Sequence, residues 1–299
     1  MSPENIEIGI IGGSGLYHLD NLTIERKVNP ETPWGFPSDE IIIARASSGV
    51  KVAFLARHGK GHFLNPSEVP SKANIAALKF LGCKVILAFS AVGSLREEIA
   101  PTHFAIPNQI IDRTKGIRPS TYFESGLVAH TSFADPFDNN LIDLVYDLRN
   151  DFPNITFHKN KTLVCMEGPA FSTRAESNMY RSFGGDLINM SVVPEAKLAK
   201  EAEIAYCMVC MSTDYDAWRE NSEGVNVEEV MKTMKTNSEN ARLLLATLID
   251  KVHFSLNDKE GTVNLNSLVG SNRYSCVTDK SKRDPELVKK LDYILPGYF

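Results

Sequence analysis

Residues 84–94 read Lys-Val-Ile-Leu-Ala-Phe-Ser-Ala-Val-Gly-Ser, and this stretch decides the fold class. From Lys84 to Phe89 the run is almost wholly apolar, which is typical of a strand buried on both faces of a sheet. Ser90 to Ser94 then supply the small and polar residues of a turn. A helical pattern over Ser71–Leu81, stopped by Gly82, comes directly before the strand. We therefore predict a helix followed by a buried strand and a polar loop.

The same alternation continues in both directions from this stretch. Apolar runs predict strands over Ile6–Ile11, Lys51–Ala56, Phe104–Ile111, Thr162–Cys165, Asp186–Ile188 and Ile204–Met211. Helical periodicity predicts helices over Asn140–Arg149, Arg174–Phe183, Pro194–Ala202 and Val227–Ile249. Buried strands that alternate with helices indicate an α/β fold with a largely parallel sheet covered on both faces. Ligands of such sheets collect at the carboxyl ends of the strands.

Composition excludes several classes of protein. The 299 residues include 32 Lys and Arg against 37 Asp and Glu, and the net charge of −5 argues against nucleic acid as the main partner. The longest apolar run is far too short for a membrane span, so we expect no membrane partner. Five cysteines, an odd number, and no secretory signal over Met1–Ile8 predict a reducing compartment: the cytoplasm, with the nucleus left open. Cys207-Met-Val-Cys210 has redox or metal spacing, but it lies in a predicted strand with no second Cys or His pair.

Polar residues gather just after the predicted strands. They include hydroxyls, an Arg and a His, beside glycines that let backbone N–H groups approach a ligand. An oxyanion with several oxygens needs such donors, whereas each residue taken singly could belong to a surface turn or cap a helix. Their shared position favours a phosphate site with the candidates Ser14, Arg57, His58, Ser90 and Ser191.

Asp214 and Asp216 follow the apolar run Ile204–Met211. Two carboxylates could bind a metal, but no His or third acid lies near enough in sequence to support one. They could also cap a helix. A third interpretation is hydrogen bonding and proton donation to a heterocycle, because burial or a neighbouring acid can keep a carboxyl group protonated.

Three longer motifs resemble a known family. They read Glu167-Gly-Pro-Ala-Phe171-Ser-Thr-Arg-Ala-Glu-Ser177, Asn189-Met-Ser-Val-Val-Pro-Glu195 and Ser212-Thr-Asp-Tyr-Asp-Ala-Trp218. Together with Ile8–Leu16 and Phe54–Leu64, they resemble the trimeric purine nucleoside phosphorylase family, in its branch that acts on S-methyl-5′-thioadenosine. The resemblance covers residues 5–250 and Ile294-Leu295-Pro296.

The resemblance implies one domain over residues 1–299, with three αβα layers and a central mixed, largely parallel sheet. Within it, residues 5–250 form the core, and 259–290 are longer and more polar than the family's usual C-terminal stretch. Residues 291–299 would reach a neighbouring subunit of a homotrimer.

The activity that the resemblance implies is phosphorolysis of S-methyl-5′-thioadenosine to adenine and 5-methylthioribose 1-phosphate, a step of purine and methionine salvage. The partners are then a small-molecule nucleoside and phosphate, the latter as co-substrate, with no metal or organic cofactor. The implied phosphate ligands are Ser14, Arg57, His58, Ser90, Ala91 and Ser191. Asp214 would face N7 and the 6-amino group of the purine, supported by Asp216.

The resemblance also assigns the nucleoside pocket. Met190 would lie against the ribose, Phe171 and Ile188 against the base, and Val227 and Val230 beside the methylthio group. His130, Ile294 and Leu295 would come from a neighbouring subunit. Ser172 and Asp214 stand where phosphorylases of 6-oxopurines carry Glu and Asn, which fits a 6-aminopurine.

Alternatives remain at this point. The chain could be a purine nucleoside phosphorylase acting on inosine or guanosine, a nucleosidase that uses water, or a non-catalytic nucleotide-binding protein. Ser14, Ser90 and Ser191 also stand where enzymes of the mammalian type usually carry Thr. A Ser lacks the stiffening methyl group, so we expect a looser phosphate site and adenosine as a secondary substrate.

Overall fold

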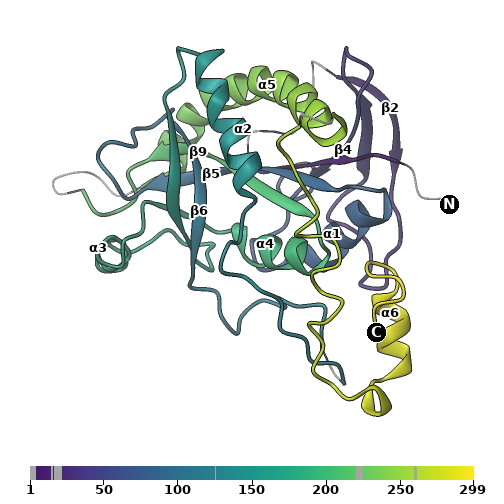
Figure 1. Ribbon diagram of the computed structural model, residues 1–299. Coiled ribbons are helices and arrows are strands. Elements are labelled where there is room, and N and C mark those ends of the chain that lie inside the picture. The colour runs from purple at the N-terminus through teal and green to yellow at the C-terminus, as the bar shows by residue number, and fades with distance from the viewer. Residues whose placement is uncertain (1–4, 15, 17–21, 125, 220–224, 259–260) are drawn as a thin grey trace.

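The computed structural model describes residues 5–14, 16, 22–124, 126–219, 225–258 and 261–299, which form a mixed α/β fold (Figure 1). Gly15, in the predicted Gly-rich turn, and residues 259–260, in the predicted polar segment, lie outside this range. The strands are β1 Ile8–Gly12, β2 Thr23–Val28, β3 Ile41–Arg45, β4 Lys51–Ala56, β5 Val85–Ser94, β6 Phe104–Asp112, β7 Phe157–Cys165, β8 Leu187–Asn189 and β9 Ala205–Asp214. The helices are α1 Ser71–Phe80, α2 Asn139–Asp147, α3 Arg174–Ser182, α4 Val192–Glu201, α5 Val227–Asn257 and α6 Pro285–Leu291, with short 3₁₀ turns at Leu148–Asn150 and Lys280–Lys282.

The sheet lies between two layers of helices. Figure 1 shows α2 and α5 on one face and α1 and α4 on the other. The strand order is β2-β3-β4-β1-β5-β8-β7-β6-β9, and β9 also pairs with β5, so the last five strands close into a ring. The pairs β1–β4, β1–β5, β5–β9, β6–β7 and β7–β8 are parallel, whereas β2–β3, β3–β4, β5–β8 and β6–β9 are antiparallel. The predicted mixed three-layer fold is therefore confirmed.

Two central strands run further than their apolar stretches predict. β5 continues through the expected turn to Ser94, and β9 continues to Asp214. Both extensions have partners, since Ser90 pairs with Cys210 and Gly93 pairs with both Ile188 and Asp214. A register shift between Val92 and Gly93 re-aims the end of β5, as bulges beside functional sites often do. Ser90, Ala91 and Asp214 thus lie on the last residues of strands, whereas Ser14, Arg57, His58 and Ser191 lie just after strand ends as predicted.

Other elements were missing from the prediction. β2 has the sequence Thr-Ile-Glu-Arg-Lys-Val and is almost fully exposed, so it lacks the buried pattern of a central strand. It pairs with β3 at one edge of the sheet. α6 begins with Pro285 after the Asp284 cap, a start signal that lies inside the segment interpreted as polar. α4 has a non-helical residue at Val193, so its regular part begins at Pro194 as predicted.

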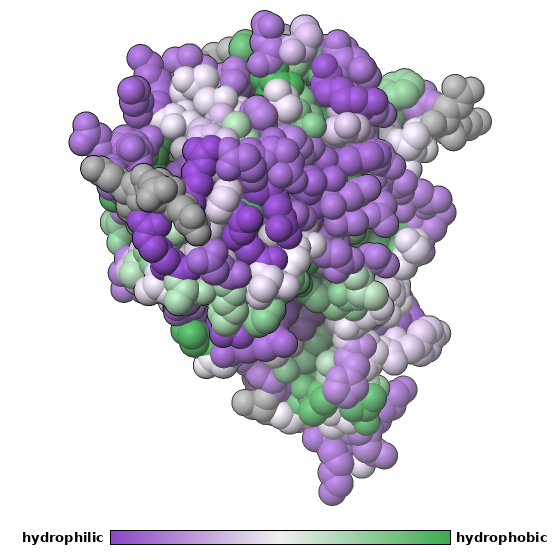
Figure 2. Space-filling view, turned by 90° about the vertical axis from the view of Figure 1, so that its left-hand side faces the viewer, coloured by the Kyte–Doolittle hydropathy of each residue, from purple (hydrophilic) through white to green (hydrophobic). Residues whose placement is uncertain are grey.

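The chain after α5 crosses the molecule and ends in a projecting C-terminal lobe, defined here as residues 280–299 (Figure 1). Glu203 anchors the crossing segment, because its carboxylate accepts hydrogen bonds from the backbone N–H groups of Gly270 and Asn272 at 2.7 and 2.8 Å. It also accepts one from the Tyr298 hydroxyl at 2.8 Å. Figure 2 shows that apolar side chains gather on the lower half of one face, toward the projecting lobe, while the upper half is mainly hydrophilic.

Candidate active site

A cavity of about 450 Å³ lies where β1, β4, β5, β8 and β9 end. The loop after β4 and the first turns of α5 complete its wall. These strands are neighbours through β1–β4, β1–β5, β5–β8 and β5–β9 pairing, which is why residues far apart in sequence meet here. The predicted residues that line it are Ser14, Arg57, His58, Ser90, Ala91, Phe171, Ile188, Met190, Ser191, Asp214, Asp216, Val227 and Val230.

One end of the cavity is a cluster of hydroxyl and amide groups. The Ser90 and Ser191 side-chain oxygens lie 3.3 Å apart. Asn189 donates from Nδ2 to each of them at 3.2 Å, so three polar groups from β5 and the end of β8 form one network. Sequence reasoning gave Asn189 no role, although its place at the end of a buried strand was a usable signal. An oxyanion with several oxygens can engage such a cluster.

Arg57 is held rigidly at the same end. Its side chain is 2% exposed, and Nε and Nη2 donate to the two Glu195 carboxylate oxygens at 2.7 and 2.9 Å. Nη1 donates to the Phe89 carbonyl at 2.9 Å, and the Tyr206 hydroxyl donates to Glu195 at 2.6 Å. Sequence reasoning assigned no role to Glu195 or Tyr206. The bidentate pair balances the charge of Arg57 and fixes its orientation.

His58 is a neutral acceptor in this cluster. Its Nδ1 lies 2.9 Å from the Leu64 carbonyl, which can only accept, so Nδ1 carries the proton. Burial and the nearby positive charge of Arg57 lower the pKa of His58 to about 4. His62, another residue that sequence reasoning missed, stacks on His58 at 4.3 Å and lies 3.5 Å from the Ser14 hydroxyl. The Nε2 lone pair of His58 can therefore accept a hydrogen bond from a ligand.

The opposite end of the cavity holds a largely buried acid. Burial, with a smaller contribution from the adjacent Asp216 carboxylate, raises the pKa of Asp214 to about 6. The Thr213 hydroxyl donates to Asp214 Oδ2 at 2.6 Å, and the Asp216 backbone N–H donates to Oδ1 at 2.8 Å. Burial also raises the pKa of Asp216, whose backbone is left-handed with φ 50°. A carboxyl group with such a pKa can donate a proton near neutral pH.

Between these ends the wall is apolar. Met190 and Ile188 come from the region of β8, while Val227 and Val230 come from the first turns of α5. Phe171 and Val227 are 42% and 64% exposed, so they border the opening. Sequence reasoning missed further apolar lining residues, namely Met166, Pro169, Met231 and Met234.

Several predicted site residues lie elsewhere. Ser172 is buried outside the lining, with its hydroxyl 3.5 Å from the Met166 sulfur. Ile294 and Leu295 are each 1% exposed and pack in this chain's own hydrophobic core. Their contact with a neighbouring subunit stays a prediction. His130 is exposed and its role stays a prediction.

Within the described residues, no group of three or more His, Cys, Asp or Glu side chains could hold a metal ion. Cys207 and Cys210 are fully buried in β9, and burial raises the pKa of both thiols, which agrees with their interpretation as core residues. In that same part of the chain no helix is long and apolar enough to cross a membrane.

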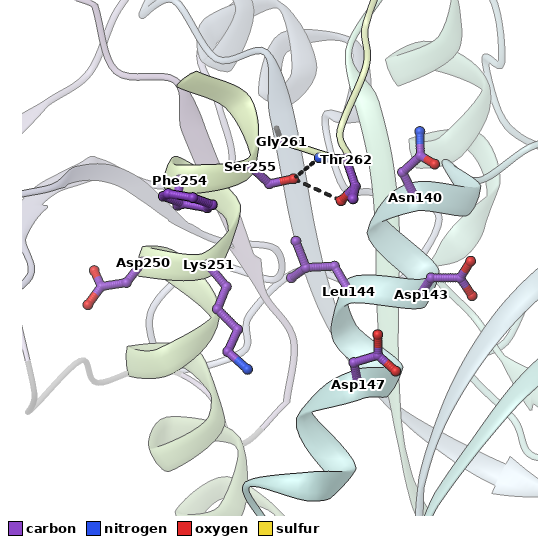
Figure 3. A pocket seen from close by; sticks show the side chains of 10 residues that line it. All are labelled: Asn140, Asp143, Leu144, Asp147, Asp250, Lys251, Phe254, Ser255, Gly261 and Thr262. Atoms are coloured by element: carbon purple, nitrogen blue, oxygen red, sulfur yellow. Dashed lines mark hydrogen bonds between the residues drawn. The ribbon is translucent and has the colours of Figure 1, made fainter. Parts of the chain in front are cut away.

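A second hollow, between α2 and α5, shares no lining residue with this cavity (Figure 3). Asp143 and Asp147 line it from α2, and Asp250 and Lys251 line it from α5. Three of these charges are in ion pairs, namely Asp143 with Lys159, Asp147 with Arg149 and Lys251 with Asp151, and Asp250 accepts a hydrogen bond from the Ser48 hydroxyl. The hollow therefore lacks the concentration of anion donors that the first cavity has.

Comparison with known proteins agrees with this geometry. Residues 7–250 match the family model described as the phosphorylase superfamily. The chain is 53% identical over 320 residues to S-methyl-5′-thioadenosine phosphorylase of Coprinopsis cinerea, covering 100% of this chain and 99% of that protein. It is 51% identical over 305 residues to the protein of the same name from Schizosaccharomyces pombe, covering 98% and 97%.

Solved structures give the same result. A methylthioadenosine phosphorylase from an antarctic soil metagenomic library superposes with a TM-score of 0.87 at 40% identity, covering 99% of this chain and 100% of that one. Methylthioadenosine phosphorylase from Schistosoma mansoni, solved with adenine, superposes with a TM-score of 0.84 at 31% identity, covering 90% and 98%.

Proposed function

This chain belongs to the phosphorylase superfamily, and we propose from its cavity how it carries out the phosphorolysis of S-methyl-5′-thioadenosine. The enzyme is a pentosyltransferase of purine and methionine salvage, and its products are adenine and 5-methylthioribose 1-phosphate. The observation that carries the proposal is the combination of an oxyanion cluster and a buried acid at opposite ends of one cavity.

Inorganic phosphate is the co-substrate and binds at the cluster formed by Ser14, Arg57, His58, Ser90, Ala91 and Ser191. Hydroxyls, the guanidinium group and the backbone N–H of Ala91 donate to its oxygens. Nε2 of His58 accepts a hydrogen bond from a phosphate O–H, since the Nδ1 proton of His58 is committed to Leu64. Phosphate held in this way is both nucleophile and counter-charge to the sugar, so positioning supplies much of the catalysis. The site needs no metal or organic cofactor.

Asp214 assists the departure of the purine. The bond between the anomeric carbon and N9 breaks, its electron pair moves into the purine, and a phosphate oxygen bonds to the anomeric carbon. A proton from Asp214 at N7 stabilises the leaving base. Asp216 supports this group through the hydrogen bond from its backbone N–H to Asp214.

The remaining wall selects the nucleoside. Met190 lies against the ribose, and Phe171 and Ile188 contact the base. Val227 and Val230 offer an apolar surface to the methylthio group, whereas a 5′-hydroxyl there would lack a partner. Inosine and guanosine are disfavoured because an Asp carboxylate can accept from a 6-amino group but receives no proton from a 6-oxo group. Adenosine is a secondary substrate; one structural relative, from Schistosoma mansoni, is described as an adenosine/methylthioadenosine phosphorylase.

The working enzyme is a homotrimer in the cytoplasm. Exposed apolar residues near His130 support a subunit contact, because Val128 and Val277 are 52% and 63% exposed and lie on adjacent segments. In the trimer, His130 covers the methylthio group of a neighbouring subunit.

The test is the release of adenine from S-methyl-5′-thioadenosine across a series of phosphate concentrations. We expect release to depend on phosphate with saturation, and inosine to be cleaved far more slowly. Equal release without phosphate would instead identify a hydrolase. Cleavage of inosine alone would show that Asp214 does not select the 6-amino group.

A further inference from the structure

Arg118 is a buried cation outside the cavity lining that contacts several segments bearing cavity residues. Its side chain is buried, and its guanidinium donates to backbone carbonyls on both sides of the oxyanion cluster. We propose that Arg118 is a positioning residue for phosphate, holding the cavity wall together and supplying a positive charge that is not paired with an acid in the described part of the chain. The proposal rests on the function proposed above.

The contacts of Arg118 join separate parts of the wall. Nη1 donates to the Met190 and Val193 carbonyls at 2.7 and 2.6 Å, on either side of Ser191. Nη2 donates to the Glu167 carbonyl at 2.7 Å, just before the segment that carries Phe171. Nε donates to the Ser67 hydroxyl at 3.2 Å, in the loop that brings His62, Asn65 and Pro66 to the cavity. One planar fork thus fixes three segments that move independently in the unfolded chain.

The charge of Arg118 differs from that of Arg57. Both side chains are buried, but Arg57 is paired with the Glu195 carboxylate. The acceptors of Arg118 in the described structure are backbone carbonyls, the Ser67 hydroxyl and the Cys165 sulfur, all without a formal charge. Its positive charge also reaches the phosphate cluster, because it lowers the pKa of His58 together with burial and Arg57. A bound phosphate dianion would therefore lie near two cations. The charge of Arg57 is balanced by Glu195, whereas the hydrogen-bond acceptors of Arg118 carry no formal charge.

Two variants separate the effect of the positive charge of Arg118 from the effect of the hydrogen bonds that its guanidinium donates. Arg118→Met removes both, and we expect the KM for phosphate to rise about tenfold or more, with a fall in kcat. Arg118→Lys keeps the positive charge but loses the planar guanidinium and its set of hydrogen bonds. We therefore expect the KM for phosphate to rise by about threefold at most and kcat to fall about tenfold. The rise in thermal midpoint caused by inorganic phosphate should shrink in the Met variant and persist in the Lys variant.

Arg96→Met is the control, because Arg96 is a partly buried Arg that pairs with Asp186 and, among the described residues, makes no hydrogen bond or ion pair with a lining residue of the cavity. Its KM for phosphate should stay within about twofold of the wild type. Wild-type values of KM and kcat in both Arg118 variants would overturn the proposal, as would equal changes in Arg96→Met. If Arg118→Met does not fold, the Lys variant decides, and an unchanged kcat there would overturn the proposal. Phosphate-independent adenine release by the wild type would instead refute the proposed function.

Discussion

At the scale of single residues, the cavity separates two titratable groups by their surroundings. Burial lowers the pKa of His58 to about 4 and raises the pKa of Asp214 to about 6. Burial favours the neutral form of each group, so His58 becomes a neutral hydrogen-bond acceptor and Asp214 a proton donor. In the proposed mechanism the acceptor faces the phosphate and the donor faces the base, which is the assignment that phosphorolysis needs.

Replacement of Asp214 by Asn tests the donor. The protonated fraction of Asp214 falls as pH rises through about 6. At saturating phosphate, kcat/KM for the nucleoside should therefore fall as the pH is raised above about 6. Asp214→Asn cannot titrate, and we expect about 100-fold lower kcat without this limb of the profile. Phosphate ionises equally in both assays, so the difference between the profiles belongs to Asp214. An Asn variant with the wild-type profile would contradict the assignment.

The sequence predicted the polar residues that lie at strand ends, but not the residues that hold them. Ser14, His58 and Ser191 were predictable because each follows an apolar run within a few positions. Glu195 was not, since its partner Arg57 lies 138 residues away and only the assembled sheet brings them together. Arg118 could not be predicted either, because it donates to backbone carbonyls, which every residue has whatever its side chain.

At the scale of elements, the first turns of α5 line the part of the cavity in which we propose that the methylthio group binds. Val230→Ser would give a 5′-hydroxyl a partner and weaken the apolar contact. We expect the ratio of kcat/KM for adenosine to that for S-methyl-5′-thioadenosine to rise about tenfold. Leu243→Ser, on an exposed turn of the same helix, is the matched control and should leave the ratio unchanged. An unchanged ratio in Val230→Ser would show that Val230 does not contact the 5′ group of the nucleoside.

The ion pair of Arg57 and Glu195 ties the end of β4 to α4, and Tyr206 adds β9. Removing one partner of a buried pair leaves the other charge without compensation, so Glu195→Gln should lower the unfolding free energy by about 3–5 kcal/mol. It should also raise the KM for phosphate, because Arg57 loses its fixed orientation. Tyr206→Phe loses one hydrogen bond and should cost about 1 kcal/mol. Urea unfolding measures both, and equal stability of Glu195→Gln and wild type would refute the role of the pair.

The central elements were predictable from apolar runs, and their ends were not. β5 and β9 extend through Ser90–Ser94 and Ser212–Asp214 because neighbouring strands pair with those backbones, whatever their side chains. β2 escaped prediction because it is a charged edge strand. Pairing with neighbouring strands therefore determines where these strands end, and local amino-acid composition does not reveal that pairing.

At the scale of the whole molecule, four apolar residues of the C-terminal lobe, Leu287, Leu291, Ile294 and Leu295, are buried in the subunit's own core. That Ile294 and Leu295 reach a neighbour stays a prediction from the resemblance, and within this chain both are buried. Sequence could not reveal this, because an apolar pair near a terminus looks the same whether it packs internally or between subunits. The predicted homotrimer consequently rests on His130 and the exposed apolar surface near it.

Glu201 makes global stability depend on pH. It accepts from the Tyr122 backbone N–H at 2.6 Å and the Thr121 hydroxyl at 2.7 Å, and burial raises its pKa to about 7. The folded state therefore binds this proton more tightly than the unfolded state does. Relative to Glu201→Gln, the wild type should lose about 3 kcal/mol of unfolding free energy as pH rises from about 4 to 7, and no more above that. Parallel stability curves for the two proteins would show that Glu201 does not titrate in this range.

The central claim is that phosphate, held at the oxyanion cluster, attacks the sugar in place of water. The most direct measurement is to cleave S-methyl-5′-thioadenosine in ¹⁸O-labelled water with unlabelled phosphate and to identify the sugar product by mass spectrometry. We expect 5-methylthioribose 1-phosphate without ¹⁸O at the anomeric carbon. Free 5-methylthioribose carrying ¹⁸O would mean that water is the nucleophile and would contradict the account.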